Sequence, residues 1–386
     1  MAAPASLAGF VARPSKFCAR GSAQAFTAPC AKRYEPRKSR ALMAADLAQR
    51  LVQWQSQHGR HDLPWQNTRD PYRVWLSEIM LQQTQVATAM AYYTRFLARF
   101  PNVVTLADAA LDDVLGLWSG LGYYSRARNL HRCAQQVVAE HGAVFPPTAA
   151  LLQTLPGIGR SSAAAVAALC FGERVAILDG NVKRVLTRVL GFEADLASAA
   201  NERALWALAQ DLLPLLDLQQ TMPRYTQGVM DLGATLCTAR QPRCEHCPLA
   251  DLCVAKAQGR QTQYPVKTRS LKRSTQSLWL LWASTASGEV WLSQRPTPGV
   301  WAGLYCFPLF DDLPALQAAL PEPYLGALEA GGALRHVLTH KDLYLYPLRL
   351  HLPDASPLGL AGAWVEPERW PGLGLPAPVR KWLTSA

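Results

Sequence analysis

Hydrophobic residues recur with helical spacing along much of the chain. Between residues 41 and 257, apolar side chains return every three or four positions, as at Leu47, Leu51 and Trp54 and again along residues 106–117. This spacing places them on one face of a helix. We therefore expect residues 41–257 to form an all-α domain.

Helix boundaries are also marked. Three glycines follow apolar stretches, at positions where a left-handed helix cap favours glycine: Gly142, Gly172 and Gly191. Pro71 suits the first turn of a helix that carries Trp75 and Ile79, because the first turn does not need its missing N–H.

The pattern changes after Cys253. Residues 258–274 are polar, basic and without period, which is typical of a linker. Strand-like runs follow at 277–284, 289–295 and 333–352, and in the last of these Pro347 separates two phases of alternating leucines. A proline between two phases predicts a bulge or a strand break. Residues 275–386 should thus form a mixed α/β domain.

Composition excludes several classes of protein. The chain has 386 residues, of which 49% are hydrophobic and 17% charged, so a sizeable core is available and global disorder is excluded. No apolar run has the length of a membrane-spanning helix. The net charge is +11, but residues 1–40 alone contribute +7, so charge is a weak argument for nucleic-acid binding. That basic segment is either a disordered extension, a misassigned start or an organellar transit peptide.

Four of the nine cysteines lie within 17 residues and form a C-x6-C-x2-C-x5-C pattern: Cys237, Cys244, Cys247 and Cys253. Without a secretory signal, this spacing indicates metal ligation in a reducing compartment. Four thiolates commonly bind zinc, but zinc sites usually pair two close C-x2-4-C elements. The uneven spacing favours a [4Fe–4S] cluster. Arg240 and Arg243, between the first two ligands, could then be held toward phosphates.

Three further segments carry candidate chemistry. The run LPGIGRSSA contains Gly157 and Gly159 and opens a helix, which suits either a plain turn or a helix-hairpin-helix contact with a DNA phosphate. Asp179 precedes a helix that starts near Asn181, so it could cap that helix or stabilise positive charge on a sugar. Glu78 lies among apolar residues, where burial would raise its pKa.

Two segments suit contact with bases. Gln82 and Gln83 provide flat amides that can enter a base stack. Tyr123 follows a glycine turn and precedes Arg126 and Arg128. Tyrosines beside arginines suit stacking on bases and clamping of phosphates, although tyrosines are equally common in cores.

In this order, the motifs resemble the helix-hairpin-helix DNA glycosylases that carry an iron–sulfur cluster, and most closely the MutY-type adenine DNA glycosylases. The resemblance covers residues 60–253 through LPWQ, WLSEIMLQQTQV, GLGYYSRARNL, LPGIGR, LDGNVKR, MDLGATLC and the four cysteines. It implies a monomeric enzyme that binds duplex DNA, flips out adenine mispaired with 8-oxoguanine or guanine, and hydrolyses its N-glycosidic bond.

The resemblance also implies roles for individual residues. Glu78 would protonate the adenine, Asp179 would stabilise or trap the sugar cation, and Asn181 would support the acid. The remaining positions would contact the adenine, the oxidised guanine or the DNA: Trp65, Gln82, Gln83, Thr84, Tyr123, Gly157, Gly159, Ser161, Lys183, Gln227, Thr339 and His340.

Ser161 separates two related activities. Endonuclease III-type enzymes, which act on oxidised pyrimidines, carry a catalytic lysine at this position, and an amine is needed to form a Schiff base. With Ser161 there, we expect a monofunctional glycosylase. Lys183 would trap an abasic sugar only incidentally.

The C-terminal residues resemble a Nudix-like domain, including QRPTPGVWAGLYCFPLF at 294–310. The glutamate-rich box that binds magnesium is missing, and Asp311 and Asp312 cannot replace it, so we expect 8-oxoguanine recognition rather than nucleotide hydrolysis. The family's Phe-Ser-His turn is here Leu338-Thr339-His340, which keeps a hydroxyl but loses the aromatic ring.

One alternative interpretation is that the protein is a non-catalytic DNA-binding module and not an enzyme. Glu78 and Asp179 argue against it, because carboxylates weaken phosphate binding. The Ala- and Leu-rich composition is typical of a bacterial protein, which predicts a cytoplasmic, nucleoid-associated location. Mitochondrial or nuclear targeting is the alternative.

Overall fold

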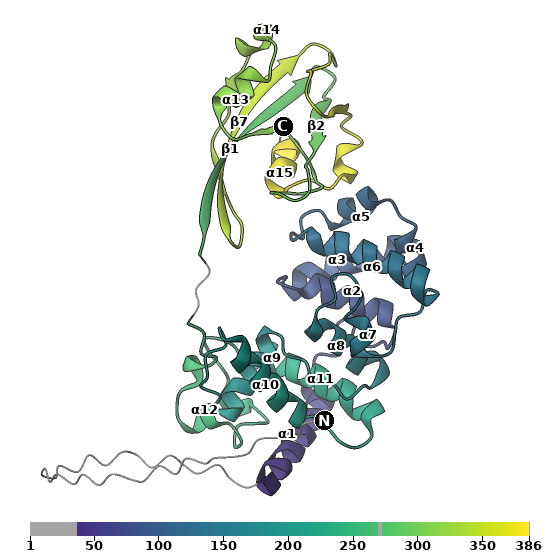
Figure 1. Cartoon of the computed structure of the whole chain (residues 1–386), viewed down its shortest axis with the longest axis vertical. Coiled ribbons are helices and arrows are strands. Elements are labelled where there is room, and N and C mark those ends of the chain that lie inside the picture. The colour runs from purple at the N-terminus through teal and green to yellow at the C-terminus, as the bar shows by residue number, and fades with distance from the viewer. Residues whose placement is uncertain (1–36, 269–271, 386) are drawn as a thin grey trace, which may run out of the picture.

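The computed structural model describes residues 37–268 and 272–385. A helical domain precedes a domain built around a mixed sheet, as the sequence predicts (Figure 1). The helices are α1 Arg37–His58, α2 Pro71–Leu81, α3 Val86–Arg99, α4 Val103–Ala107, α5 Leu111–Trp118, α6 Ser125–His141, α7 Ala149–Leu152, α8 Arg160–Phe171, α9 Gly180–Leu190, α10 Ala199–Asp211, α11 Leu218–Thr235 and α12 Val254–Ala257, with 3-10 turns η1 Cys244–His246 and η2 Gln261–Gln263.

The marked helix ends are confirmed. Pro71 is the first residue of α2, and the Asp70 side chain caps this helix by accepting from Tyr72 N. Gly142, Gly172 and Gly191 each end a helix in the left-handed conformation. Residues 106–117 differ from the predicted single face, because they are divided between α4 and α5. The apolar spacing continues across the break since both helices pack against one core.

The helical domain has two apolar cores that meet at α8. Ala163 and Ala167 belong to the core under α2, α3 and α6, whereas Ala164 and Ala168 belong to the core under α1, α9 and α11. Small residues on both faces of α8 let the helix pack closely against α2 and α11. Helices α2 and α11 thus pack against different faces of α8.

The C-terminal domain contains an eight-stranded sheet in its described part. Its elements are β1 Ser274–Thr285, β2 Val290–Gln294, β3 Tyr305–Cys306, β4 Leu309–Phe310, α13 Leu313–Ala318, α14 Glu322–Leu325, β5 Glu329–Ala330, β6 Leu334–Val337, β7 Lys341–Leu352, β8 Ala363–Val365, η3 Trp370–Gly372 and α15 Ala377–Ser385. The long strands β1 and β7 pair in parallel along their whole lengths.

The predicted bulge or break at Pro347 is wrong, because β7 runs through it without interruption. Pro347 only accepts a hydrogen bond there, from Gly331 N at 2.8 Å, so its missing N–H is not needed. The leucine phase changes because the two halves of β7 face different cores: Leu343 and Leu345 pack with Phe307, and Leu348, Leu350 and Leu352 pack with Leu316.

Two expected boundaries also differ. Residues 1–36 of the predicted extension lie outside the described residues, but α1 already begins at Arg37. The predicted linker is partly packed on the helical domain, since Tyr264 is buried and Val266 O accepts a hydrogen bond from Leu196 N. Only residues 269–271 of that segment are outside the description.

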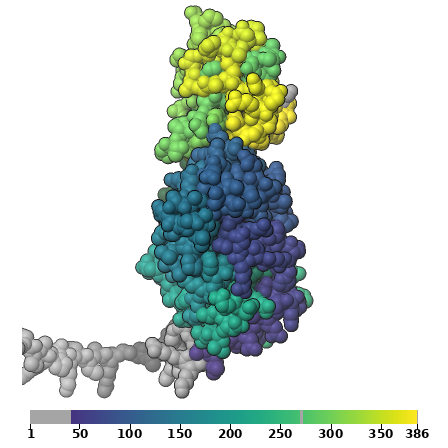
Figure 2. All heavy atoms as spheres, turned by 90° about the vertical axis from the view of Figure 1, so that its right-hand side faces the viewer, coloured from purple at the N-terminus to yellow at the C-terminus, as the bar shows by residue number. Residues whose placement is uncertain are grey.

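The two domains touch at the α5–α6 region, and the space-filling view displays this contact (Figure 2). Tyr305 donates to Asp112 at 2.9 Å, Arg128 donates to Ala302 O at 2.6 Å, and Tyr124 donates to Leu375 O at 2.8 Å. Across the described ranges, no helix combines the length and hydrophobicity that crossing a bilayer requires.

Candidate active site

A cavity between α2, α11 and the loop before α2 brings together three of the predicted residues. Glu78 from α2, Trp65 from the loop and Gln227 from α11 all line it, together with Leu169 at the end of α8. Trp65 packs edge-to-face on Tyr93, with ring centroids 5.2 Å apart. The cavity is lined mainly by apolar side chains and by a few polar groups, which suits a flat heterocycle.

Glu78 is held in a poorly hydrated position. Glu78 is half-buried and lines the cavity, and among the described residues it has no hydrogen-bond or ion-pair partner. Burial raises the pKa of Glu78 to about 7, and the nearby Asp179 charge adds to this shift. A carboxyl with this pKa can donate a proton near neutral pH.

Asp179 lies directly before α9 and serves as its N-cap. Its Oδ1 accepts from Val182 N at 2.7 Å, so the structural alternative considered from sequence is correct for this residue. Burial raises the pKa of Asp179, while hydrogen bonds from the backbone of Val182 and Asn181 oppose the shift. The cap fixes the carboxylate in one orientation beside Glu78, which does not prevent a catalytic role.

Asn181 supports the neighbourhood rather than reaching into the cavity. Its Oδ1 accepts from Arg184 at 2.8 Å, and Arg184 also donates to Gly233 O and Cys237 O. A side chain at Gly233 would lie 2.8 Å from the Asn181 Cβ atom, so α9 and α11 approach closely here.

Two further residues, Arg60 and Asp231, belong to this site and were not predicted from the sequence. Arg60 also lines the cavity, and it is paired with Asp231, which is fully buried on α11. Gln227 donates to the same Asp231 carboxylate at 2.9 Å. Asp231 belongs to the MDLGATLC segment, but its partner Arg60 lies 171 positions away in the sequence.

The end of α2 and the turn before α6 form a second group. Gln83 and Tyr123 are both exposed and both adopt left-handed backbone conformations, with φ of 57° and 50°. Such strain in a non-glycine residue often marks a functional site. Gln82 donates from Nε2 to Ser162 Oγ at 3.3 Å, and Thr84 accepts from Arg126 at 3.2 Å.

The arginines beside Tyr123, which were predicted to clamp phosphates, form hydrogen bonds within the protein. The buried Arg126 guanidinium donates to the carbonyls of Ile79, Met80, Gln82, Leu121 and Gly122. It therefore joins the two segments that present Gln83 and Tyr123. Burial lowers the pKa of Arg126 to about 10. Arg128 is occupied at the domain contact.

The hairpin segment ends in a surface suited to close approach. Gly157 has φ of 76°, and a side chain there would lie 2.5 Å from Asn129 Cβ. Gly159 caps the start of α8 and has open space where a side chain would be. Ser161 Oγ accepts from Leu178 N at 3.1 Å, next to Asp179. Lys183 forms an ion pair with Glu202.

The predicted recognition turn lies opposite Tyr123. The hydroxyls of Thr339 and Tyr123 hydrogen-bond to one another across the two domains. His340 is exposed, and its carbonyl accepts from Ser274 N at the start of β1.

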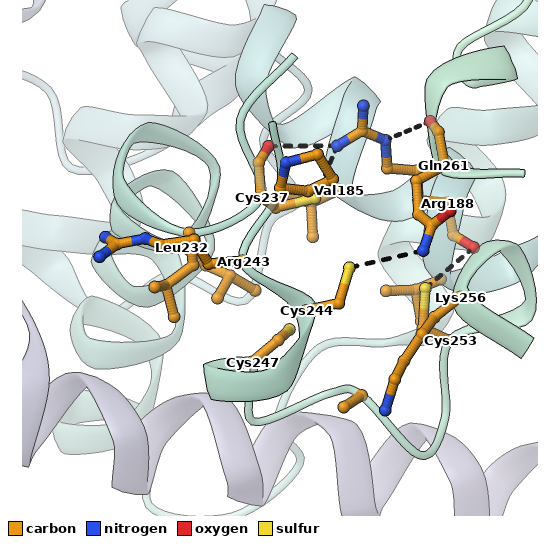
Figure 3. Close-up of a pocket in the computed structure, with 14 residues that line it drawn as sticks. Val185, Arg188, Leu232, Cys237, Arg243, Cys244, Cys247, Cys253, Lys256 and Gln261 are labelled. Atoms are coloured by element: carbon orange, nitrogen blue, oxygen red, sulfur yellow. Dashed lines mark hydrogen bonds between the residues drawn. The ribbon is translucent and has the colours of Figure 1, made fainter. Parts of the chain in front are cut away.

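The four cysteines line one cavity below α9, and Figure 3 displays their side chains around it. Across the described part of the chain, no group of three His, Cys, Asp or Glu side chains is close enough to hold a single metal ion. The four thiols instead line one shared cavity, which leaves room for a polynuclear cluster. Donors also approach the sulfurs, with Arg188 at 3.3 Å from Cys237 Sγ and Gln261 at 3.7 Å from Cys244 Sγ. The residues fit a [4Fe–4S] cluster.

Arg188 is a structural residue of this loop that sequence reasoning missed. It is 1% exposed and donates to the carbonyls of Thr238, Ala239 and Gln261. Arg188 follows Arg184 by four residues on α9, so the two side chains share one face of the helix. This spacing is the sequence signal that could have identified Arg188. Arg243 donates to Thr235 O, whereas Arg240 is exposed and unpaired in the described residues.

Known proteins resemble both domains. Residues 76–211 match the HhH-GPD superfamily of base excision DNA repair proteins, residues 237–253 match the iron-sulfur binding domain of endonuclease III, and residues 279–385 match the NUDIX domain. A thermostable thymine-DNA glycosylase superposes with a TM-score of 0.48 at 27% identity, over 57% of this chain and 98% of that chain.

Two curated relatives share a name. The adenine DNA glycosylase of Mus musculus is 46% identical over 215 residues, which are 53% of this chain and 41% of that protein. The adenine DNA glycosylase of Buchnera aphidicola subsp. Acyrthosiphon pisum (strain APS) is 35% identical over 342 residues, which are 87% of this chain and 96% of the relative. The chain therefore belongs to the adenine DNA glycosylase family, as a base excision repair enzyme with a [4Fe–4S] site.

Proposed function

We propose that this enzyme removes adenine mispaired with 8-oxoguanine or guanine in duplex DNA. The observation that carries the proposal is the placement of Glu78, with its pKa raised to about 7, near the carboxylate of Asp179 and in a cavity lined mainly by apolar residues. Duplex DNA does not fit inside this cavity, so the adenine must first leave the stack, at a cost of a few kcal/mol.

The two carboxyl groups would divide the chemistry. Glu78 would protonate a ring nitrogen of the flipped adenine, which lets the base leave without negative charge. Asp179, held by its cap to α9, would stabilise the sugar cation or trap it before water attacks. Asn181 would act indirectly, because its side chain holds Arg184, which donates to Gly233 O on α11.

The same arrangement supports hydrolysis without strand cleavage. Ser161 occupies the position where a lyase would need an amine, and its hydroxyl is already used by Leu178 N. Lys183 is paired with Glu202. Neither residue offers a free amine beside Asp179, so the enzyme should be monofunctional.

The base opposite adenine would be recognised at the junction of the two domains. Tyr123, on a strained turn, and Thr339, on the β6–β7 connection, meet there and both carry hydroxyls that can contact a base. Asp312, one of the acidic residues of the C-terminal domain, caps α13 by accepting from Ala315 N at 2.7 Å. Capping alone does not decide the role of Asp312, but the glutamate-rich box that binds magnesium is missing from this domain, which favours recognition over metal-dependent hydrolysis.

The remaining contacts would hold the DNA backbone. Gly157, Gly159 and the first turn of α8 offer backbone N–H groups to a phosphate. The cluster loop would present Arg240, and when bound the cluster would act by fixing this loop.

The test is release of free adenine from duplexes that differ only in the opposite base. Adenine opposite 8-oxoguanine and opposite guanine should be released, and adenine opposite thymine should not. The matched variant Glu78→Gln should bind the first duplex but release no base. Equal release by Glu78→Gln, or release from the thymine pair, would contradict the proposal.

A further inference from the structure

An ion pair joins Arg60, which lines the base cavity, to Asp231, which is fully buried on α11. Asp231 has no exposed surface, and its carboxylate accepts from Arg60 Nε at 2.7 Å and from Arg60 N at 3.1 Å. The Arg60 Nη2 atom lies 2.6 Å from the same carboxylate. A buried charge that is paired and hydrogen-bonded in this way is fixed in orientation.

This carboxylate determines how the amide of Gln227 is turned. Gln227 donates from Nε2 to Asp231 Oδ1 at 2.9 Å. An ionised carboxylate only accepts hydrogen bonds, so it can face the amide nitrogen but not the amide oxygen. The Oε1 atom of Gln227 is therefore the end left for a ligand, and Gln227 lines the cavity that also contains Glu78.

We propose that Asp231 is a positioning residue that makes the cavity select 6-amino purines over 6-oxo purines, an inference that rests on the proposed adenine chemistry. N7 and the 6-substituent lie on the same edge of a purine. A base that brings N7 to Glu78 brings its 6-substituent to a neighbouring wall of the same cavity. There the Gln227 oxygen accepts from an amino group and opposes a carbonyl oxygen.

The discriminating variant is Asp231→Asn. The new amide can donate to Gln227 Oε1, which frees Gln227 to turn its own nitrogen toward the cavity. Single-turnover base release would be measured with adenine, hypoxanthine and unsubstituted purine, each opposite 8-oxoguanine. We expect the adenine-to-hypoxanthine rate ratio to fall about tenfold, the effect of one hydrogen bond. Unsubstituted purine reports any general loss of catalysis.

A double-mutant cycle tests whether Asp231 acts through Gln227. Gln227→Met should lose the same discrimination, and adding Asp231→Asn to it should change the ratio no further. Asp231→Glu keeps an acceptor and should retain more discrimination than Asp231→Asn. Folding of Asp231→Asn is checked by its melting temperature and cluster absorbance. If this variant does not fold, the adenine-to-hypoxanthine ratio of Gln227→Met alone tests the inference.

The outcomes separate this inference from the proposed function. If the parent enzyme releases adenine but Asp231→Asn, or failing that Gln227→Met, keeps the parent ratio, the positioning role is wrong and the proposed function stands. If the parent enzyme releases no adenine from the 8-oxoguanine duplex, the proposed function itself fails.

Discussion

The hydroxyl of Tyr123 is hydrogen-bonded to the hydroxyl of Thr339, although the two residues are 216 positions apart and belong to different domains. Tyr123 reaches this position through a left-handed backbone conformation that Arg126 stabilises from below. The contact joins the strained turn of the glycosylase domain to the β6–β7 connection of the C-terminal domain. Both side chains therefore lie together at the domain junction, where we propose that the base opposite adenine is recognised.

Removing this contact should weaken recognition of the oxidised base. Tyr123→Phe and Thr339→Val each delete one hydroxyl, and each should reduce the preference for 8-oxoguanine over guanine by about threefold to tenfold. Because the hydroxyls share one contact, the double variant should lose less than the sum of both effects. Binding titrations with the two duplexes measure this, and full additivity would contradict a shared role.

Glu78 should lower the thermal stability of the folded protein at alkaline pH. Its folded-state pKa is raised to about 7 by burial, so the protonated form is favoured in the folded state. The Glu78 carboxyl contributes most favourably to folding stability at pH values below its pKa in the unfolded chain. This contribution is lost as pH rises through about 7. Glu78→Gln should therefore melt at a higher temperature than the parent at pH 8, and the difference should narrow at pH 5. The exposed Glu140→Gln is the control and should show no such trend in thermal melts.

The same pKa predicts the alkaline limb of the rate profile. Glu78 must be protonated to act as an acid, so single-turnover adenine release should fall as pH rises through about 7. The measurement is the rate at saturating enzyme between pH 5 and pH 9. A rate that stays constant up to pH 9 would exclude Glu78 as the proton donor.

Arg126 should determine the shape of the DNA-contacting surface. Arg126→Met removes a buried guanidinium and leaves several carbonyls without donors, which should destabilise the fold by about 2–4 kcal/mol. It should also weaken duplex binding, since both Gln83 and Tyr123 lose their support. Arg132→Met, exposed on the same helix, should change neither denaturant stability nor binding.

Local signals in the sequence predicted much of this fold. The capping glycines, Pro71 and the cysteine spacing depend on short-range geometry, and each was placed correctly. The leucine phase change at Pro347 was also a true signal, but its cause was misjudged. A strand that buries opposite faces in two different cores gives the same pattern as a bulge, and only the tertiary structure distinguishes them.

Residues whose roles depend on distant partners were beyond sequence reasoning. Arg126 beside tyrosines suggested a phosphate clamp, whereas its burial follows from the close approach of two segments. Asp231 and Arg60 are individually ordinary and become informative only as an ion pair whose carboxylate also accepts from Gln227. The Tyr123–Thr339 contact required the placement of one domain on the other.

The most direct test of the whole account is single-turnover cleavage of a labelled duplex that contains adenine opposite 8-oxoguanine, with and without hot alkali. A duplex with thymine glycol opposite adenine serves as the competing substrate. We expect strand breaks only after alkali and only in the 8-oxoguanine duplex, because a glycosylase without a catalytic amine leaves an intact abasic strand. Strand breaks without alkali in the thymine glycol duplex would contradict both the substrate and the role assigned to Ser161.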